Sequence, residues 1–176
     1  MRTSVAWAGA EGVPGQVERI FMFERFTEHA RAVMLLANQE AQQFGHEFIG
    51  TEHILGGLAK EVHGVAAAVL QHFNVDLKPL RKAVEILLAG HPHVEVTEKL
   101  AQTEHTKNVI RYAVEEARSL RHNHIGTEHL LLGLMRDSEA TSARILANLG
   151  LNLDAVREEV RRLAPPSHEV ANYRSE

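Results

Sequence analysis

The sequence predicts an all-α protein with eight helices, arranged as two pseudo-symmetric four-helix repeats that form one compact domain. The first observation is a five-residue motif that occurs twice, as Ile49-Gly50-Thr51-Glu52-His53 and as Ile125-Gly126-Thr127-Glu128-His129. The 76-residue offset that aligns the two copies also aligns 19 identical residues between positions 30 and 88 without a gap, which indicates an internal duplication. The second observation is that apolar residues recur every three or four positions, as in amphipathic helices, and no strand pattern competes.

Four helices are expected in the first repeat, over residues 27–43, 51–60, 64–72 and 76–88. Thr27 and Asp76 belong to the residue types that cap a helix N-terminus with a side-chain oxygen. Phe44-Gly45-His46 ends the first helix. In the second helix, Leu55 and Leu58 recur at a helical spacing, so we expect them in the core.

The second repeat is expected to form the same four helices, over residues 103–120, 127–136, 139–149 and 152–163. Leu131 and Leu134 are again expected in the core. Pro165 and Pro166 stop the last helix, because proline cannot continue the helical hydrogen bonds. The connector between the repeats, residues 89–102, has no counterpart in the repeat pattern.

The expected domain boundaries follow from these elements. Residues 22–164 form the double-repeat domain, with repeat 1 at about 27–88 and repeat 2 at about 103–164. Residues 1–21 show neither a helical nor an alternating period, which favours a disordered leader. Residues 165–176 are expected to be a flexible tail.

The composition excludes several classes of function. The chain has no cysteine, so it has neither disulfides nor thiol ligands, which is compatible with a cytoplasmic protein. A net charge of −4 argues against nucleic acid as a partner, because such binding needs a basic surface. No apolar run approaches the length of a membrane span. We expect a cytoplasmic monomer that binds neither nucleic acid nor membrane.

Motifs that carry enzyme chemistry are missing from the sequence. It contains no Gly-x-x-x-x-Gly-Lys-Ser/Thr run that could cradle the phosphates of ATP, and no Gly-x-Ser-x-Gly nucleophile turn. We therefore expect no catalytic residues, no cofactor and no enzymatic activity.

The two motifs have a structural and a functional interpretation. In the structural one, Thr51 and Thr127 cap the helices that begin there, while Glu52 and Glu128 place negative charge where the helix dipole favours it. In the functional one, a carboxylate next to helix N-terminal amides forms a site with two signs of charge. The carboxylate binds a guanidinium and the amides bind an anion.

Histidines near both motifs raise the question of a metal site. His46 and His53 flank the first turn, and His122, His124 and His129 flank the second. Zinc sites use three or four convergent ligands, and no spacing such as His-Glu-x-x-His occurs here. We expect the imidazoles to hydrogen-bond the backbone, and we expect no metal.

Several segments resemble the amino-terminal (Clp N) domain of Clp unfoldase ATPases, closest to the ClpC type. They are Met22-Phe23-Glu24-Arg25-Phe26-Thr27-Glu28, the two Gly-Thr-Glu-His copies, and the leucine-rich runs that follow each copy. The resemblance covers roughly residues 22 to 164. Met22 lies where it begins, and we hypothesise that Met22 is the physiological start.

The resemblance implies a substrate- or adaptor-recognition module, with Clp unfoldase or protease components and client or adaptor proteins as partners. In ClpC-type domains, the glutamate of each Gly-Thr-Glu-His motif receives the guanidinium of phosphoarginine. These residues match Glu52 and Glu128, with Thr51 and Thr127 beside them. Phe23 and Phe26 are candidate protein-binding residues before the first helix, where we expect one to pack against the helix start and the other to stay accessible to partners. The alternative is a structural accessory subunit that docks on a Clp protease or unfoldase without recognising modified residues.

Overall fold

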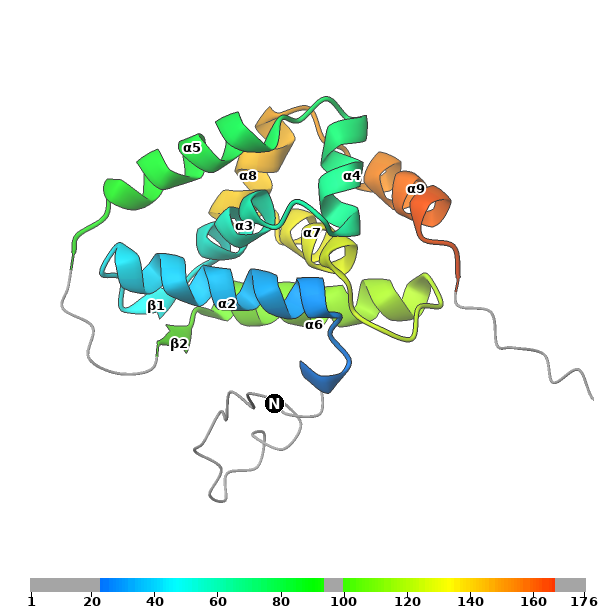
Figure 1. Ribbon diagram of the computed structural model, residues 1–176, viewed down its shortest axis with the longest axis horizontal. Helices are drawn as coiled ribbons and strands as arrows, with labels where there is room; N and C mark the ends of the chain where they lie inside the picture. The colour runs from blue at the N-terminus through cyan, green and yellow to red at the C-terminus, as the bar shows by residue number, and fades with distance from the viewer. Residues whose placement is uncertain (1–22, 94–99, 167–176) are drawn as a thin grey trace, which may run out of the picture.

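The computed structural model describes residues 23–93 and 100–166, and these residues form the predicted all-α fold. Its helices are α2 (Glu28–Gln43), α3 (Thr51–Lys60), α4 (Val65–His72), α5 (Leu77–Ala89), α6 (Glu104–Ser119), α7 (Thr127–Arg136), α8 (Thr141–Asn148) and α9 (Leu153–Leu163) (Figure 1). Each helix of the second repeat starts 76 residues after its counterpart in the first. The expected leader, residues 1–21, lies outside the described residues, as does the expected tail from residue 167.

Side-chain caps start four of these helices. Thr27 accepts a hydrogen bond from the amide of Ala30 at 3.1 Å, and Asp76 accepts one from the amide of Lys78 at 3.0 Å. Thr103 and Asn152 cap α6 and α9 in the same way. Because a side-chain oxygen satisfies an amide that lacks a partner within the helix, these starts could be predicted from sequence to within a residue.

Two short strands connect the repeats, and the sequence did not predict them. Strand β1 (Phe48–Ile49) pairs in parallel with β2 (Ala101–Gln102), and a matching bridge joins Phe26 to Ile125. We expected residues 89–102 to correspond to nothing in the repeat. This is wrong for the last two residues of that segment, because β2 is the counterpart of residues 25–26. Pairs of two residues are too short to show an alternating period.

The helices form three layers (Figure 1). The central helices α3 and α7 contact each other, with α2 and α6 on one side and the remaining four helices on the other. Helix α4 of the first repeat contacts α7 and α9 of the second, so the repeats interlock. Leu55, Leu58, Leu131 and Leu134 are at most 1% exposed, which confirms that the leucine runs form the core.

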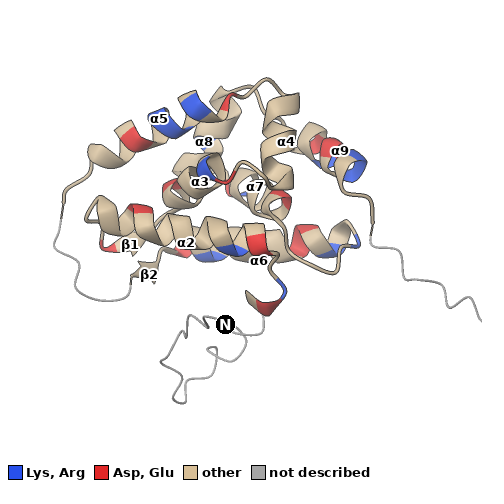
Figure 2. Cartoon of the chain, viewed as in Figure 1, with Lys and Arg blue, Asp and Glu red and all other residues tan. Residues whose placement is uncertain are grey.

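Several helices carry charged residues of both signs (Figure 2). Helices α5, α6 and α9 each carry acidic and basic residues, whereas α4 carries neither. Among the described residues, no helix is both long and apolar enough to cross a membrane.

Two equivalent glycines allow the closest helix crossings. A Cβ at Gly57 would lie 2.5 Å from the carbonyl oxygen of Val33 on α2, and a Cβ at Gly133 would clash with the carbonyl oxygen of Val109 on α6. The backbone of each central helix therefore packs directly on the backbone of its neighbour.

We predict that Gly57→Ala and Gly133→Ala each lower the free energy of unfolding by about 2 kcal/mol or more, because the clash with a carbonyl outweighs the gain in helix propensity of about 1 kcal/mol. Urea unfolding measures the change. Gly90→Ala is the matched control, since its Cβ would meet nothing nearer than 3.4 Å. Equal stabilities for all three variants would contradict the close crossing.

Candidate functional site

Each five-residue motif forms the turn that enters a central helix. Gly50 and Gly126 are the N-cap residues, with extended backbone at φ −92° and −96°. Thr51 and Thr127 are the first helical residues, so the expectation that they cap their own helices is wrong. The amide of Gly50 instead donates to Nδ1 of His53 at 2.9 Å, and the amide of Gly126 donates to Nδ1 of His129 at 2.8 Å.

Buried histidine pairs fix the shape of the turns. Because Nδ1 of His53 accepts from Gly50, its Nε2 carries the proton and donates to Nδ1 of His46 at 2.8 Å. Nε2 of His46 then donates to the carbonyl oxygen of Leu88 at 3.1 Å. All three bonds use neutral imidazoles. The expectation that an imidazole bonds the backbone across the turn is confirmed for His53 and His129.

The second histidine pair lacks the final bond. Nε2 of His129 donates to Nδ1 of His122 at 2.8 Å, as in the first pair. However, Nε2 of His122 is buried without a hydrogen-bond partner. The residue equivalent to Leu88 is Ala164, which lies beyond the end of α9, whereas Leu88 lies within α5. The shorter last helix thus leaves the second pair less firmly held than the first.

Burial lowers the pKa of both central histidines. It brings the pKa of His53 to about 4, with opposing contributions from Glu52, which raises it, and His46, which lowers it. Burial and the neighbouring His122 bring the pKa of His129 to about 3. Both rings are therefore neutral at neutral pH, as the hydrogen bonds require.

The two threonines have different roles. The hydroxyl oxygen of Thr127 accepts a hydrogen bond from the amide of Ala66 at 3.0 Å, so it caps α4 of the other repeat. Gly64 makes this possible, because a Cβ there would collide with that hydroxyl. The equivalent of Gly64 in the second repeat is Ala140, which carries a Cβ. The hydroxyl of Thr51, the equivalent of Thr127, instead contacts the carboxylate of Glu52 at 3.5 Å.

The two glutamates both fold back over the glycine before them. A Cβ at Gly50 or Gly126 would clash with the carboxylate of Glu52 or Glu128. The side chain of Glu52 is 22% exposed, but that of Glu128 is only 9% exposed, and burial raises the pKa of Glu128. The carboxylates lie 3.6 and 3.5 Å from Nδ1 of His53 and His129, yet these nitrogens carry no proton and form no ion pair.

A cation would not join the three groups at the second turn. Atoms of His122, Glu128 and His129 lie within 4.8 Å of one another. However, Glu128 approaches Nδ1 of His129, while His122 is bonded to Nε2 on the other side of the ring. Since both ring nitrogens are already engaged, one ion would have to break these bonds to meet all three ligands.

The sequence comparisons identify the family. The family model for the Clp repeat (R) N-terminal domain matches residues 25–139 and 101–175. This chain belongs to that family. A ClpA homolog of Guillardia theta, an ATP-binding subunit of the ATP-dependent Clp protease, is 49% identical over 150 residues, which are 85% of this chain and 18% of the relative. Chloroplastic ClpC1 of Arabidopsis thaliana is 46% identical over 149 residues, again 85% of this chain and 16% of the relative.

Solved Clp N-domains share the fold. The N-terminal domain of ClpD from Arabidopsis thaliana matches with a TM-score of 0.62 and 26% identity, over 80% of this chain and 96% of that one. A ClpV N-domain in complex with a VipB peptide matches with a TM-score of 0.68 and 13% identity, over 86% of this chain and 94% of that one. The chain spans less than a fifth of the length of the curated relatives above.

The two phenylalanines before α2 differ in burial within this Clp repeat domain. Phe26 is 1% exposed and belongs to the core, so it is the one that packs, and its candidacy as a protein-binding residue is wrong. Its backbone pairs with Ile125, which draws the side chain inward. Phe23 packs on Phe26 with ring centroids 5.0 Å apart and stays partly exposed. Only Phe23 remains a candidate.

The buried histidines predict that the Clp repeat domain loses stability in acid. Their folded pKa values lie below the unfolded value of about 6.5, so between pH 6.5 and about 4 only the unfolded chain takes up these protons. Each histidine should cost about 1.4 kcal/mol per pH unit in that window. Urea unfolding at several pH values measures the slope.

His53→Gln should reduce the pH dependence of the unfolding free energy by about 1.4 kcal/mol per pH unit, which is the contribution of one histidine. The control is His63→Gln, at an exposed position, which should keep the wild-type slope. Glu128 works in the opposite direction, because its folded pKa is raised, but it is present in all three proteins. Identical slopes for wild type and His53→Gln would refute a neutral buried ring.

The threonine difference predicts unequal effects of the same substitution. Thr127→Val leaves the amide of Ala66 buried without its acceptor, so we expect a loss of about 1–2 kcal/mol in the free energy of unfolding. Thr51→Val removes only a 3.5 Å contact and should cost clearly less. Chemical denaturation of the two variants tests the prediction, and equal losses would disprove the cap between repeats.

Proposed function

We propose that this chain is a recognition module that binds client or adaptor proteins for ATP-dependent degradation by the Clp system. Membership of the Clp repeat family supports the proposal, as do relatives named as ATP-binding subunits of Clp protease and as Clp chaperones. The chain carries no ATP-binding cradle sequence and spans less than a fifth of those relatives. The ATP-driven steps would therefore belong to other modules.

We further propose phosphoarginine as the feature recognised. The supporting observation is that two equivalent carboxylates, on Glu52 and Glu128, each lie at the first turn of a helix. The carboxylate would take the guanidinium, while helix N-terminal amides would take the phosphate. Free arginine offers only the guanidinium and should bind far more weakly.

The two turns would not bind equally. The carboxylate of Glu52 is the more accessible of the two, since its side chain is 22% exposed against 9% for Glu128. Glu128 is buried, and its raised pKa shows that the surroundings disfavour its charge. The first turn is therefore the stronger site in the proposal.

Calorimetry with phosphoarginine tests this function. Glu52→Gln should weaken binding at the first turn about tenfold to a hundredfold, because a hydrogen bond to a charged group contributes about 1.5–3 kcal/mol. Glu128→Gln should have a smaller effect on the total binding, and the double variant should abolish it.

The matched control is Glu47→Gln, an exposed glutamate just before β1 that should leave the affinity unchanged. Circular dichroism checks that the variants stay helical. Unchanged affinity in the folded double variant would remove both glutamates from recognition and leave helix capping as their role. Capture of a Clp protease ring without any client peptide would favour the accessory-subunit alternative.

A further inference from the structure

A buried glutamate occupies the same place near the end of α2 and α6. Glu40 is 2% exposed and Glu116 is 3% exposed. Each borders a surface groove, and the two grooves are equivalent in the repeat, since most of their lining residues differ by 76 positions. A charge removed from water requires partners for both carboxylate oxygens. The two repeats meet this requirement differently.

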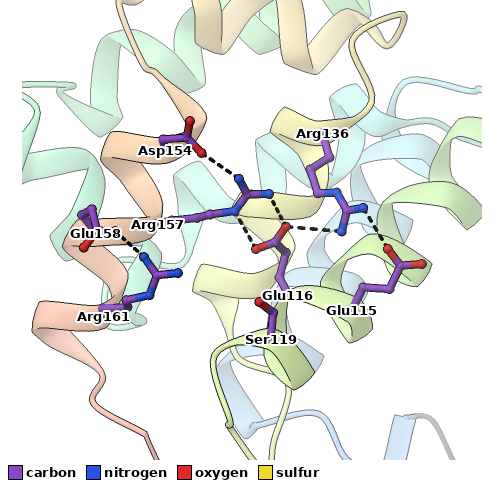
Figure 3. Close-up of a pocket in the computed structure, with 8 residues that line it drawn as sticks. All are labelled: Glu115, Glu116, Ser119, Arg136, Asp154, Arg157, Glu158 and Arg161. Carbon is purple, nitrogen blue, oxygen red and sulfur yellow. Dashed lines mark hydrogen bonds and ion pairs between the residues drawn. The ribbon is translucent and has the colours of Figure 1, made fainter.

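In the second repeat the carboxylate is fully paired (Figure 3). Arg157 donates through Nε to one oxygen of Glu116 at 3.0 Å and through Nη2 to the other at 2.7 Å. Arg136 approaches the latter oxygen at 3.3 Å. The Glu116 carboxylate thus holds two guanidinium groups, one of them bidentate.

In the first repeat the second cation is missing. Lys60, the counterpart of Arg136, pairs with Oε1 of Glu40. Oε2 of Glu40 is buried with no hydrogen-bond partner. Arg81, the counterpart of Arg157, instead donates to Glu85 at 3.0 Å and is 53% exposed.

Helix α5 carries the opposite charge to α9 at two equivalent positions, and this explains why Arg81 turns outward. Glu85 lies one turn after Arg81 and attracts it, whereas the counterpart of Glu85 is Arg161, which cannot attract Arg157. Asp154, one turn before Arg157, holds that arginine at 2.9 Å; its counterpart is Lys78, which would repel Arg81. The local sequence thus keeps the intramolecular arginine away from Glu40.

The first groove also has an apolar wall that would suit a peptide. Its volume is about 430 Å³, and Phe44, Ile86 and Ala89 line it beside Glu40. Ile86 is 66% exposed, which is high for an isoleucine on a folded helix. The counterpart of Ile86 is Arg162, so the second repeat lacks this apolar element.

We propose that the groove between α2, α3 and α5 binds an unmodified arginine side chain of a partner protein. The guanidinium would donate to the unpaired oxygen of Glu40, as Arg157 donates to Glu116. An apolar residue beside that arginine would pack on Ile86. This site is separate from the two Gly-Thr-Glu-His turns and does not depend on phosphoarginine recognition. The partner is a protein segment in which arginine adjoins an apolar residue.

The test uses a short peptide with one arginine between leucines, titrated into the intact chain and followed by amide NMR shifts. The peptide should shift the amides of Lys82 and Ile86. A matched peptide with citrulline, which has the shape of arginine without its charge, should bind about tenfold more weakly or worse. Equal binding of the two peptides would overturn the proposal.

Variants separate this site from the alternatives. Glu40→Gln should weaken the arginine peptide about tenfold, while Glu116→Gln should leave its affinity unchanged. If Glu40→Gln fails to fold, Ile86→Ser at an exposed position should still lower the affinity severalfold. Arg81→Ala should not change binding. Tighter binding in Arg81→Ala would show that Arg81 itself occupies Glu40, and would overturn the proposal.

The same peptide also distinguishes this proposal from phosphoarginine recognition. The double variant Glu52→Gln with Glu128→Gln should bind the unmodified arginine peptide as the wild type does. Loss of peptide binding in that variant, together with wild-type shifts centred on Gly50 and Gly126, would assign the peptide to the turns and overturn the site at Glu40.

Discussion

The backbone pairing between repeats is the constraint on which the rest of the structure depends. Ile49 pairs with Gln102, and Ile125 pairs with Phe26, so the segment that enters each repeat is held by the other repeat. The amides of Thr27 and Thr103 donate across the same contacts at 3.0 and 3.1 Å. Each Gly-Thr-Glu-His turn directly follows one of these pairs. The position of both turns is therefore set jointly by the two halves.

Neutral imidazoles then hold the turns in one shape. A histidine at the third helical position accepts from the glycine amide and donates to a second histidine. This arrangement leaves the glutamate at the second position free of any bond to the ring, although the ring is only about 3.5 Å away. The histidine satisfies the N-cap amide in place of the glutamate, so the carboxylate is not needed as a helix cap.

The same fold supports two different halves because small sequence changes act at buried contacts. Gly64 admits the hydroxyl of Thr127, whereas Ala140 stands at the equivalent place. The carbonyl of Leu88 completes one histidine chain, and the shorter α9 leaves the other incomplete. Glu116 is saturated by two arginines, while Glu40 keeps one oxygen unpaired. In each case the repeats share a backbone, and one side chain or helix end decides whether a polar group finds a partner.

The sequence by itself determined the helices and their repeat, because helical periodicity and capping are local properties that a one-dimensional pattern records. Seven of the predicted helix starts lie within one residue of those observed, and the eighth, at Thr141, differs by two. The sequence also located the two motif turns. Only the tertiary structure decided that Thr127 caps a helix of the other repeat, that Phe26 is buried, and that Glu128 is less accessible than Glu52. These properties depend on contacts between residues far apart in the chain, and no local pattern specifies which distant backbone will cover a side chain.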